Sequence, residues 1–199
     1  MKELGSATED EMVLAFLKAE IDSPCYGPCC QSYLTRLGLD RKPLIDEADI
    51  GNAKHNQIRL ELLKKCRGYK ANQYLFTDFP GDVQWRRVEL EPGELKRLKY
   101  INLETWTTLT GKTRRVVDGA RNVGTIPIDE DTIARIKAVA DRITRGDRFP
   151  ELIVVEGDGQ DLILLEGHTR ATAYVLAEPS YPIELLVGSS REMNKWHYY

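Results

Sequence analysis

The sequence predicts a protein of the mixed α+β class, with a small mixed sheet flanked by helices and a helical region at the N-terminus. Apolar residues recur at helical spacing through much of the first 70 residues. After residue 122, by contrast, helical segments alternate with short apolar runs that are typical of strands. We therefore divide the chain into a helical N-terminal region, residues 1–80, and a mixed domain, residues 81–199.

Three helices are expected in the N-terminal region. Thr8 followed by Glu11 has the spacing of a capping box, and the apolar pattern after it continues to about Ile21. A second helix is expected to begin near Pro28, because proline is favoured in a first helical turn. A third is expected over residues 52–66, where apolar side chains form a stripe.

The mixed domain is expected to alternate strands and helices. Expected strands lie at residues 83–90, 152–156, 161–165 and 182–187, with a hairpin turn at 157–159 and helices at 129–145 and 167–177. The Thr-rich segment 103–109 is expected to be a strand or an extended loop. The aromatic tail that includes Trp196 is expected to dock on the body or on a partner subunit, so a homodimer is one assembly that we consider.

Composition indicates a globular protein that lies in the cytoplasm. Hydrophobic residues make up 42% of the chain and charged residues 30%, and no apolar run approaches the roughly 20 residues that span a bilayer. The N-terminus is acidic and lacks the apolar stretch of a signal peptide, so no membrane partner is expected. In the cytoplasm the four cysteines are expected to be reduced.

A zinc site at the cysteines is the alternative that we considered and set aside. The set Cys25, Cys29, Cys30, His55 and Cys66 lacks the paired spacing that zinc ligands usually show, and adjacent cysteines on a helix point in different directions. We therefore expect no metal there and interpret the cysteines as small buried residues.

One segment of the chain is basic although the net charge is −3. Residues 84–121 hold nine basic and five acidic side chains, and they directly precede the part of the chain that carries the expected phosphate site. Such an excess attracts a polyanion or a phosphorylated ligand. A solvated helix face with Lys96, Arg97 and Lys99 explains half of this excess of positive charge without any ligand.

The most informative stretch is the junction after the strand at 161–165. The apolar run stops at Glu166-Gly167, and a helix is expected to begin with His168-Thr169-Arg170. A helix N-terminus offers free backbone N–H groups and a positive dipole, and glycine allows an anion to approach closely. The junction therefore predicts a cradle for phosphate, although strand-glycine-helix turns are also common as purely structural features.

The order of elements from residue 112 to 188 resembles the ParB and sulfiredoxin superfamily domain. Proteins of this superfamily bind a nucleotide at a helix that begins with glycine. Gly167 and Arg170 match the two characteristic positions of that helix, and Ala173 matches the small residue that follows. The resemblance implies a nucleotide ligand, namely ATP, ADP or CTP, with Mg²⁺ as the accompanying ion.

Three branches of the superfamily differ at this motif. The chromosome-partitioning branch has Gly-Glu-Arg-Arg and a following helix-turn-helix domain, whereas His168 and Thr169 stand here at the two inner positions. Sulfiredoxin needs a cysteine where this chain has His168. The free serine kinase branch has an acid followed by Gly-His-His-Arg, which Glu166, Gly167, His168 and Arg170 match with only Thr169 departing.

This agreement implies an enzyme that transfers a phosphoryl group from a nucleotide to a small acceptor, or that hydrolyses the nucleotide. The side chains expected at the nucleotide are Gly167, His168, Thr169, Arg170, Arg115 and Arg121. Glu166 and Asp118 are the candidate catalytic carboxylates, Asp118 because it follows an expected strand in the basic segment. His168 is the third catalytic candidate, and we expect its imidazole to be protonated beside phosphate.

A second hypothesis is a ParB-like, DNA-associated protein that uses the cradle as a nucleotide switch or as a grip on the phosphate backbone. Nucleic acid would then contact the basic segment. The side chains expected to track its phosphates are Arg86, Arg87, Lys112, Arg114, Arg115 and Arg121. A third hypothesis is that the cradle is vestigial and the protein is an interaction partner, so the sequence leaves an enzymatic role open.

Overall fold

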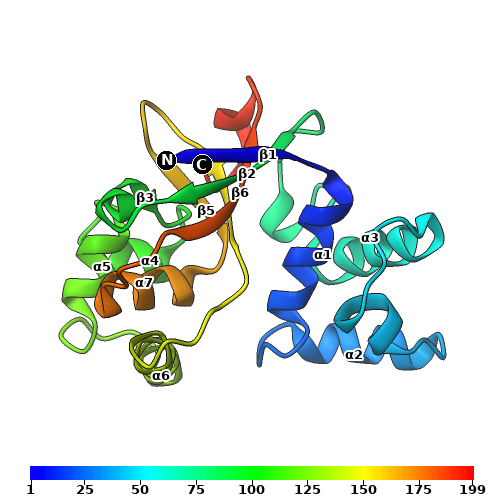
Figure 1. The fold of residues 1–199 in the computed structure, drawn as a ribbon, viewed down its shortest axis with the longest axis horizontal. Helices are drawn as coiled ribbons and strands as arrows, with labels where there is room; N and C mark the ends of the chain where they lie inside the picture. Colours follow the sequence, from blue (N-terminus) through cyan, green and yellow to red (C-terminus); the bar gives the residue numbers. More distant parts are fainter.

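The structure, a computed structural model, describes all 199 residues and contains one six-stranded mixed sheet between two groups of helices (Figure 1). The strand order is β1-β2-β6-β4-β5-β3, in which the pairs β4/β6 and β3/β5 are parallel and the other three are antiparallel. The α+β class that the sequence predicted is therefore confirmed. The strands are β1 (Lys2–Ala7), β2 (Gln84–Leu90), β3 (Leu98–Lys99), β4 (Leu152–Glu156), β5 (Leu162–Glu166) and β6 (Ile183–Ser189).

Helices cover both faces of the sheet. The N-terminal helices α1, α2 and α3 lie on one side, and α5, α6 and α7 lie on the other, with α4 beside α5 (Figure 1). None of them combines the length and the apolar character that crossing a bilayer requires. The helices are α1 (Glu9–Glu20), α2 (Gly27–Arg36), α3 (Ala53–Arg67), α4 (Glu104–Leu109), α5 (Val116–Asn122), α6 (Glu130–Thr144) and α7 (His168–Ala177).

The central strands β4 and β5 explain why two helical layers form. Successive side chains of a strand point to opposite faces, and the first four residues of each of these strands are apolar and buried. Ile153 and Leu165 join the core under α1 to α3, whereas Leu152 and Leu164 join the core under α5 to α7. Each face of the sheet therefore needs its own helical cover.

The expected N-terminal helix is confirmed, but the region before it is not helical. Thr8 caps α1, and Glu11 closes the capping box. Residues before Thr8 form β1, which pairs with β2 at the edge of the sheet. The sequence missed this strand because KELGSA has no alternating apolar pattern, and the neighbouring strand supplies its hydrogen bonds. The residues 1–80 thus contribute a strand and three helices to a core that they share with the sheet.

The segment 103–109 was also interpreted wrongly, because it forms α4 and not a strand or an extended loop. Its threonines bond locally to the helix backbone: the Thr107 hydroxyl donates to the Glu104 carbonyl over 3.0 Å. This local bond stabilises a turn in a segment of high β-propensity.

The aromatic tail docks on the body of the protein. Trp196 is 2% exposed, and its indole Nε1 donates to the carbonyl of Leu75 over 2.7 Å. Its ring meets Phe79 edge to face at 5.4 Å. The tail thus joins the segment after α3 to the last strand of the sheet and ties the two regions of the chain together.

We expect Trp196→Ala to lower the free energy of unfolding by about 3–5 kcal/mol, because it removes a large buried ring and leaves the Leu75 carbonyl without its partner. Urea unfolding at neutral pH measures this loss. Lys195→Ala is the control, because that side chain is 65% exposed in the same tail. An equal loss in the two variants would show that the tail is held by something other than the indole.

Candidate functional site at the N-terminus of α7

The candidate site begins where β5 ends at Glu166 and the chain turns into α7. Gly167 has φ +96°, and a Cβ atom built there would lie 2.5 Å from Cδ2 of Leu152, so the turn requires glycine. No side chain caps α7, whereas Thr8 and Asn52 cap α1 and α3. The first-turn N–H groups of α7 therefore have no side-chain partner, which leaves the anion-binding end of this helix uncapped.

Four charged side chains from both layers gather at this junction. Arg67 at the end of α3 lies 4.0 Å from Glu20 at the end of α1, and these side chains are 11% and 12% exposed. Arg170 forms an ion pair with Glu166, and they are 11% and 13% exposed. The two pairs also act on one another, because the charges of Glu166 and Arg170 influence the pKa of Glu20. We call Glu20, Arg67, Glu166 and Arg170 the junction cluster.

The guanidinium of Arg170 is held by the protein itself. Besides Glu166, it donates from Nη1 to the carbonyl oxygens of Pro150 and Glu151, over 2.7 and 3.3 Å. These bonds occupy N–H groups of the Arg170 guanidinium that were expected to bind phosphate. Arg170 therefore fixes Glu166 and the segment that leads into β4. Thr169 stands beside it in the first turn of α7 and is partly buried.

The imidazole of His168 is buried and neutral. Its ring stacks on Trp106 with centroids 5.2 Å apart, and Trp106 stacks on Tyr100 at 4.6 Å. Although the whole residue is only partly buried, Nε2 is inaccessible to solvent and has no hydrogen-bond partner. Burial, with the charges of Arg67 and Arg170, lowers the pKa of His168 to about 3. The expectation of a protonated imidazole beside phosphate is therefore wrong for this structure.

Glu20 and Arg67 are the members of the junction cluster that the sequence analysis missed. Burial raises the pKa of Glu20; the charge of Arg67 opposes this shift and that of Glu166 adds to it. The guanidinium of Arg67 lies 3.6 Å from the ring centre of Tyr26, and its buried Nε has no hydrogen-bond partner. The sequence held one signal for Glu20: it is an acidic side chain in the last turn of a helix, where its charge interacts unfavourably with the helix dipole.

Three predicted site residues have their partners outside the junction cluster. Asp118 does not follow a strand: it is in the first turn of α5, where it accepts from the Thr113 hydroxyl over 2.7 Å and pairs with Arg121 at 3.1 Å. Arg115 lies 3.7 Å from Asp161, just before β5, whereas Glu166 ends that strand. At about 3.3 Å per residue these two ends are about 17 Å apart. Arg115 therefore does not reach the N-terminus of α7, although Trp106 of the same basic segment stacks on His168.

The cysteines are not all reduced, in contrast to the expectation. Cys29 and Cys66 form a disulfide between α2 and α3, while Cys25 and Cys30 are free thiols, the first exposed and the second buried. The cysteine and histidine set considered for zinc is not brought together, and no group of three or more His, Cys, Asp or Glu side chains is placed to hold a metal ion.

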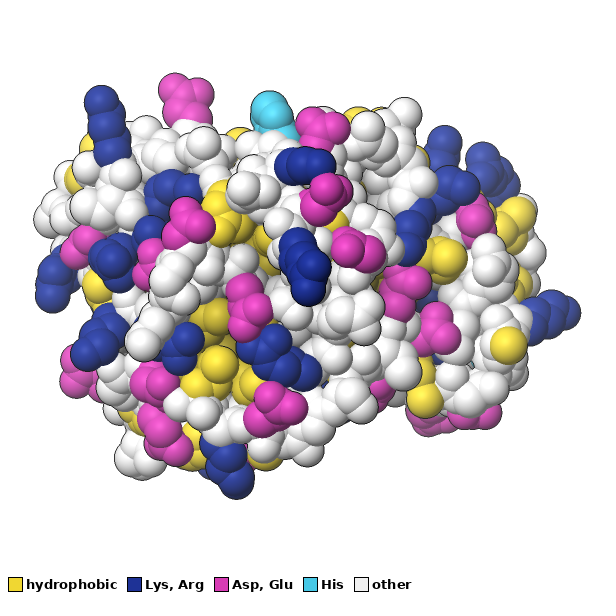
Figure 2. Space-filling view, turned by 90° about the horizontal axis from the view of Figure 1, so that it is seen from above, with side chains coloured by type: hydrophobic (Ala, Val, Ile, Leu, Met, Phe, Trp, Pro, Cys, Tyr) yellow, Lys and Arg dark blue, Asp and Glu magenta, His cyan; other side chains and the backbone are white.

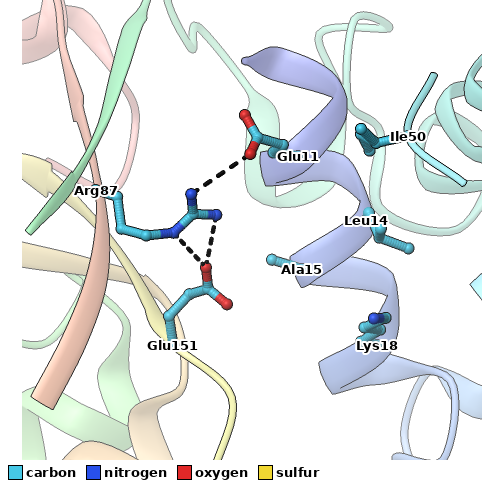
Figure 3. A pocket seen from close by; sticks show the side chains of 7 residues that line it. All are labelled: Glu11, Leu14, Ala15, Lys18, Ile50, Arg87 and Glu151. Atoms are coloured by element: carbon cyan, nitrogen blue, oxygen red, sulfur yellow. Dashed lines mark hydrogen bonds and ion pairs between the residues drawn. The ribbon is translucent and has the colours of Figure 1, made fainter. Parts of the chain in front are cut away.

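A cleft of about 230 Å³ opens between α1 and the sheet (Figure 3). In Figure 3 the guanidinium of Arg87 reaches between the carboxylates of Glu11 and Glu151, at 3.4 and 3.0 Å. The cleft adjoins α7, because the backbone carbonyl of Glu151 accepts a hydrogen bond from Arg170. Its wall on the helical side consists of Leu14, Ala15, Lys18 and Ile50.

Comparison of the chain with protein-family models, with curated proteins and with solved structures finds no match in any of the three. The resemblance to the ParB and sulfiredoxin superfamily therefore stays a prediction that the residues at Gly167 and Arg170 carry. The junction cluster and the N-terminus of α7 are the features of the structure that bear on function.

The low pKa of His168 predicts a pH dependence of stability. The unfolded chain takes up a proton near the usual pKa of 6.5, whereas the folded protein does so only near 3. The stabilisation is therefore complete above pH 6.5 and declines as the pH falls toward 3, by about 2 kcal/mol at pH 5.

Urea unfolding of wild type and of His168→Gln at pH 7 and pH 5 isolates this contribution, because glutamine does not titrate. The decline in the free energy of unfolding from pH 7 to pH 5 should be smaller in the variant than in wild type by about 2 kcal/mol. Equal declines would mean that His168 titrates in the folded protein near its ordinary pKa.

Proposed function

We propose that this chain is an enzyme that binds the phosphates of a nucleotide at the N-terminus of α7 and transfers a phosphoryl group to a small acceptor. The observation that carries the proposal is the meeting of an uncapped helix N-terminus with Arg67, a nearly buried arginine whose Nε has no partner. Buried polar groups are normally satisfied, so an unpaired guanidinium N–H at an anion-binding helix end favours an anionic ligand.

Arg67 is the side chain best suited to hold phosphate. Its charge already contributes to the low pKa of His168, so it lies close to the first residue of α7. Its guanidinium is held by the ring of Tyr26 and by the carboxylate of Glu20 and keeps Nε free. A charge held in place and removed from water stabilises a transferring phosphoryl group more strongly than a mobile surface charge does.

The carboxylates of the cluster suit the rest of the reaction. Mg²⁺ in phosphoryl-transfer enzymes is usually held by one or two carboxylates together with the phosphates, and Glu20 and Glu166 provide two carboxylates that influence one another. When bound, the ion would neutralise charge on the phosphates. Glu20, whose pKa burial raises, is the candidate to accept the proton of the acceptor hydroxyl, because a base works best when its pKa approaches the working pH.

The neighbouring cleft is the candidate place for the acceptor. Its volume of about 230 Å³ is below the usual range for drug-sized ligands, so it suits a small molecule. The carboxylate of Glu151 lines the cleft, while its backbone carbonyl is bonded to Arg170 of the junction cluster. A molecule bound in the cleft would therefore lie next to the phosphate site.

Nothing in the arrangement of charges favours the DNA-associated alternative. Arg86 pairs with Glu156, Arg114 donates to backbone carbonyls, and among the six basic residues named for DNA contact only Lys112 has neither an ion pair nor a side-chain hydrogen bond. The face in Figure 2 carries basic and acidic side chains interspersed. A strand of nucleic acid binds best to a continuous surface of one sign.

We expect Arg67→Gln to weaken nucleotide binding by at least about tenfold, because a hydrogen bond to a charged group contributes about 1.5–3 kcal/mol. Calorimetric titration of ATP, ADP and CTP, each with and without Mg²⁺, measures the effect. Arg121→Gln is the matched control, since that arginine is 76% exposed on α5. Binding that survives in Arg67→Gln but fails in Arg121→Gln would move the site to α5, and no binding of any nucleotide to wild type would reject the proposal.

Glu20→Gln should separate binding from chemistry. At saturating nucleotide, which offsets any loss of affinity from the lost contact with Arg67, we expect it to lower the rate of transfer by about 10²–10⁴-fold, the usual contribution of a general base. The readout is release of labelled phosphate, or its transfer to a panel of small alcohols, at saturating nucleotide. Glu91→Gln on the surface before β3 serves as the control. An unchanged rate in Glu20→Gln would remove the base role from this residue.

A further inference from the structure

Two disulfide-bonded cysteines and one free cysteine belong to the segment where α2 begins and α3 ends. The disulfide between Cys29 and Cys66 links the two helices across 37 residues of sequence, with the Cα atoms 5.8 Å apart. The Cys29 end of this disulfide is exposed, and Cys66 is 8% exposed. Cys25 is a free and exposed thiol four residues before Cys29.

The backbone places Cys25 one turn before Cys29. Tyr26 has φ −118° and ψ −19°, in the right-handed helical region, and Gly27 and Pro28 are the first residues of α2. Side chains four residues apart on such a turn have Cβ atoms about 5–6 Å apart, whereas a disulfide joins Cβ atoms about 3.5–4.5 Å apart. A bond between Cys25 and Cys29 therefore requires the turn to tighten until these two Cβ atoms approach by about 1–2 Å.

The other free thiol is not a competitor. Cys30 is 1% exposed and faces the core under α1 to α3. Burial, together with the charge of Glu20, raises the pKa of Cys30 to about 11, so this group stays a thiol at neutral pH. Because the thiolate is the species that attacks a disulfide, the exposed Cys25 is the nucleophile available here.

We propose that Cys25 and the Cys29–Cys66 disulfide form a thiol–disulfide exchange site. The thiolate of Cys25 attacks the Sγ of Cys29, a bond forms between these two sulfur atoms, and the bond from Cys29 to Cys66 breaks. Cys66 leaves as a thiolate and takes up a proton equivalent to the one that Cys25 released. The exchange needs no oxidant or reductant, since one disulfide and one thiol are present before and after it.

The exchange acts on the junction cluster through Arg67. This arginine directly follows Cys66 and packs on the ring of Tyr26, which directly follows Cys25. In the exchanged form α3 is no longer bonded to α2, so the end of α3 that positions Arg67 loses its covalent support. This consequence for nucleotide binding rests on the proposed function, whereas the exchange itself does not.

Peptide mapping tests the exchange. The oxidised protein is held at pH 8, quenched with acid, alkylated and cleaved with trypsin. Residues 19–36 form one tryptic peptide that contains Cys25, Cys29 and the buried Cys30, whereas Cys66 lies in another. We expect a fraction of wild type to carry a disulfide within peptide 19–36 together with alkylated Cys66, and Cys25→Ser to lose this species entirely. Its absence from wild type, although the same mapping detects it after exchange in urea, would overturn the proposal.

Cys30→Ser keeps the exposed thiol and should retain the exchanged species, which also excludes a bond to Cys30. Disappearance of that species in this variant would transfer the role to the buried cysteine and overturn the assignment of Cys25. For the link to Arg67, Cys66→Ser should weaken nucleotide binding about as much as Arg67→Gln, at least about tenfold. If the disulfide exchanges but no nucleotide binds, the exchange site is supported and the proposed function is rejected. If a nucleotide binds but the disulfide does not exchange, the proposed function is supported and the exchange site is rejected.

Discussion

The burial of β4 and β5 on both faces of the sheet is the constraint on which the rest of the structure depends. Each strand presents apolar side chains to two cores, so the sheet cannot leave a face to water. One face takes the N-terminal helices and the other takes α5 to α7. Because both layers extend to the end of β5, side chains from distant parts of the chain meet at that end.

The junction cluster is an energetically costly way to stabilise a fold. Two arginines and two glutamates are removed from water at an energetic cost that their attraction repays only with good geometry, and apolar residues of similar size often stabilise a core better. The raised pKa of Glu20 and the Arg67 Nε that has no hydrogen-bond partner add to that energetic cost. Such costs concentrate where a protein binds or transforms a ligand, which is why the functional argument starts from this cluster.

The disulfide gives the helical layer a second means of holding Arg67. A covalent link that closes 37 residues stabilises a fold by about 4 kcal/mol in the chain-entropy model. It also holds the end of α3 against the beginning of α2, next to Tyr26. The ring of Tyr26 and the disulfide therefore act on the same arginine, one through packing and the other through the backbone.

Local features follow from the amino-acid sequence: the capping box of α1, the two-sided strands β4 and β5, and the Gly167 turn into α7. Each depends on residues that are neighbours along the chain, so periodicity and turn chemistry suffice. Which charged groups meet depends on tertiary packing. Glu20 and Arg67 enter the site, Asp118, Arg115 and Arg121 pair with residues outside it, and His168 becomes neutral. Burial and the pairing of distant charges depend on how the layers pack, and no local pattern in the chain specifies that packing.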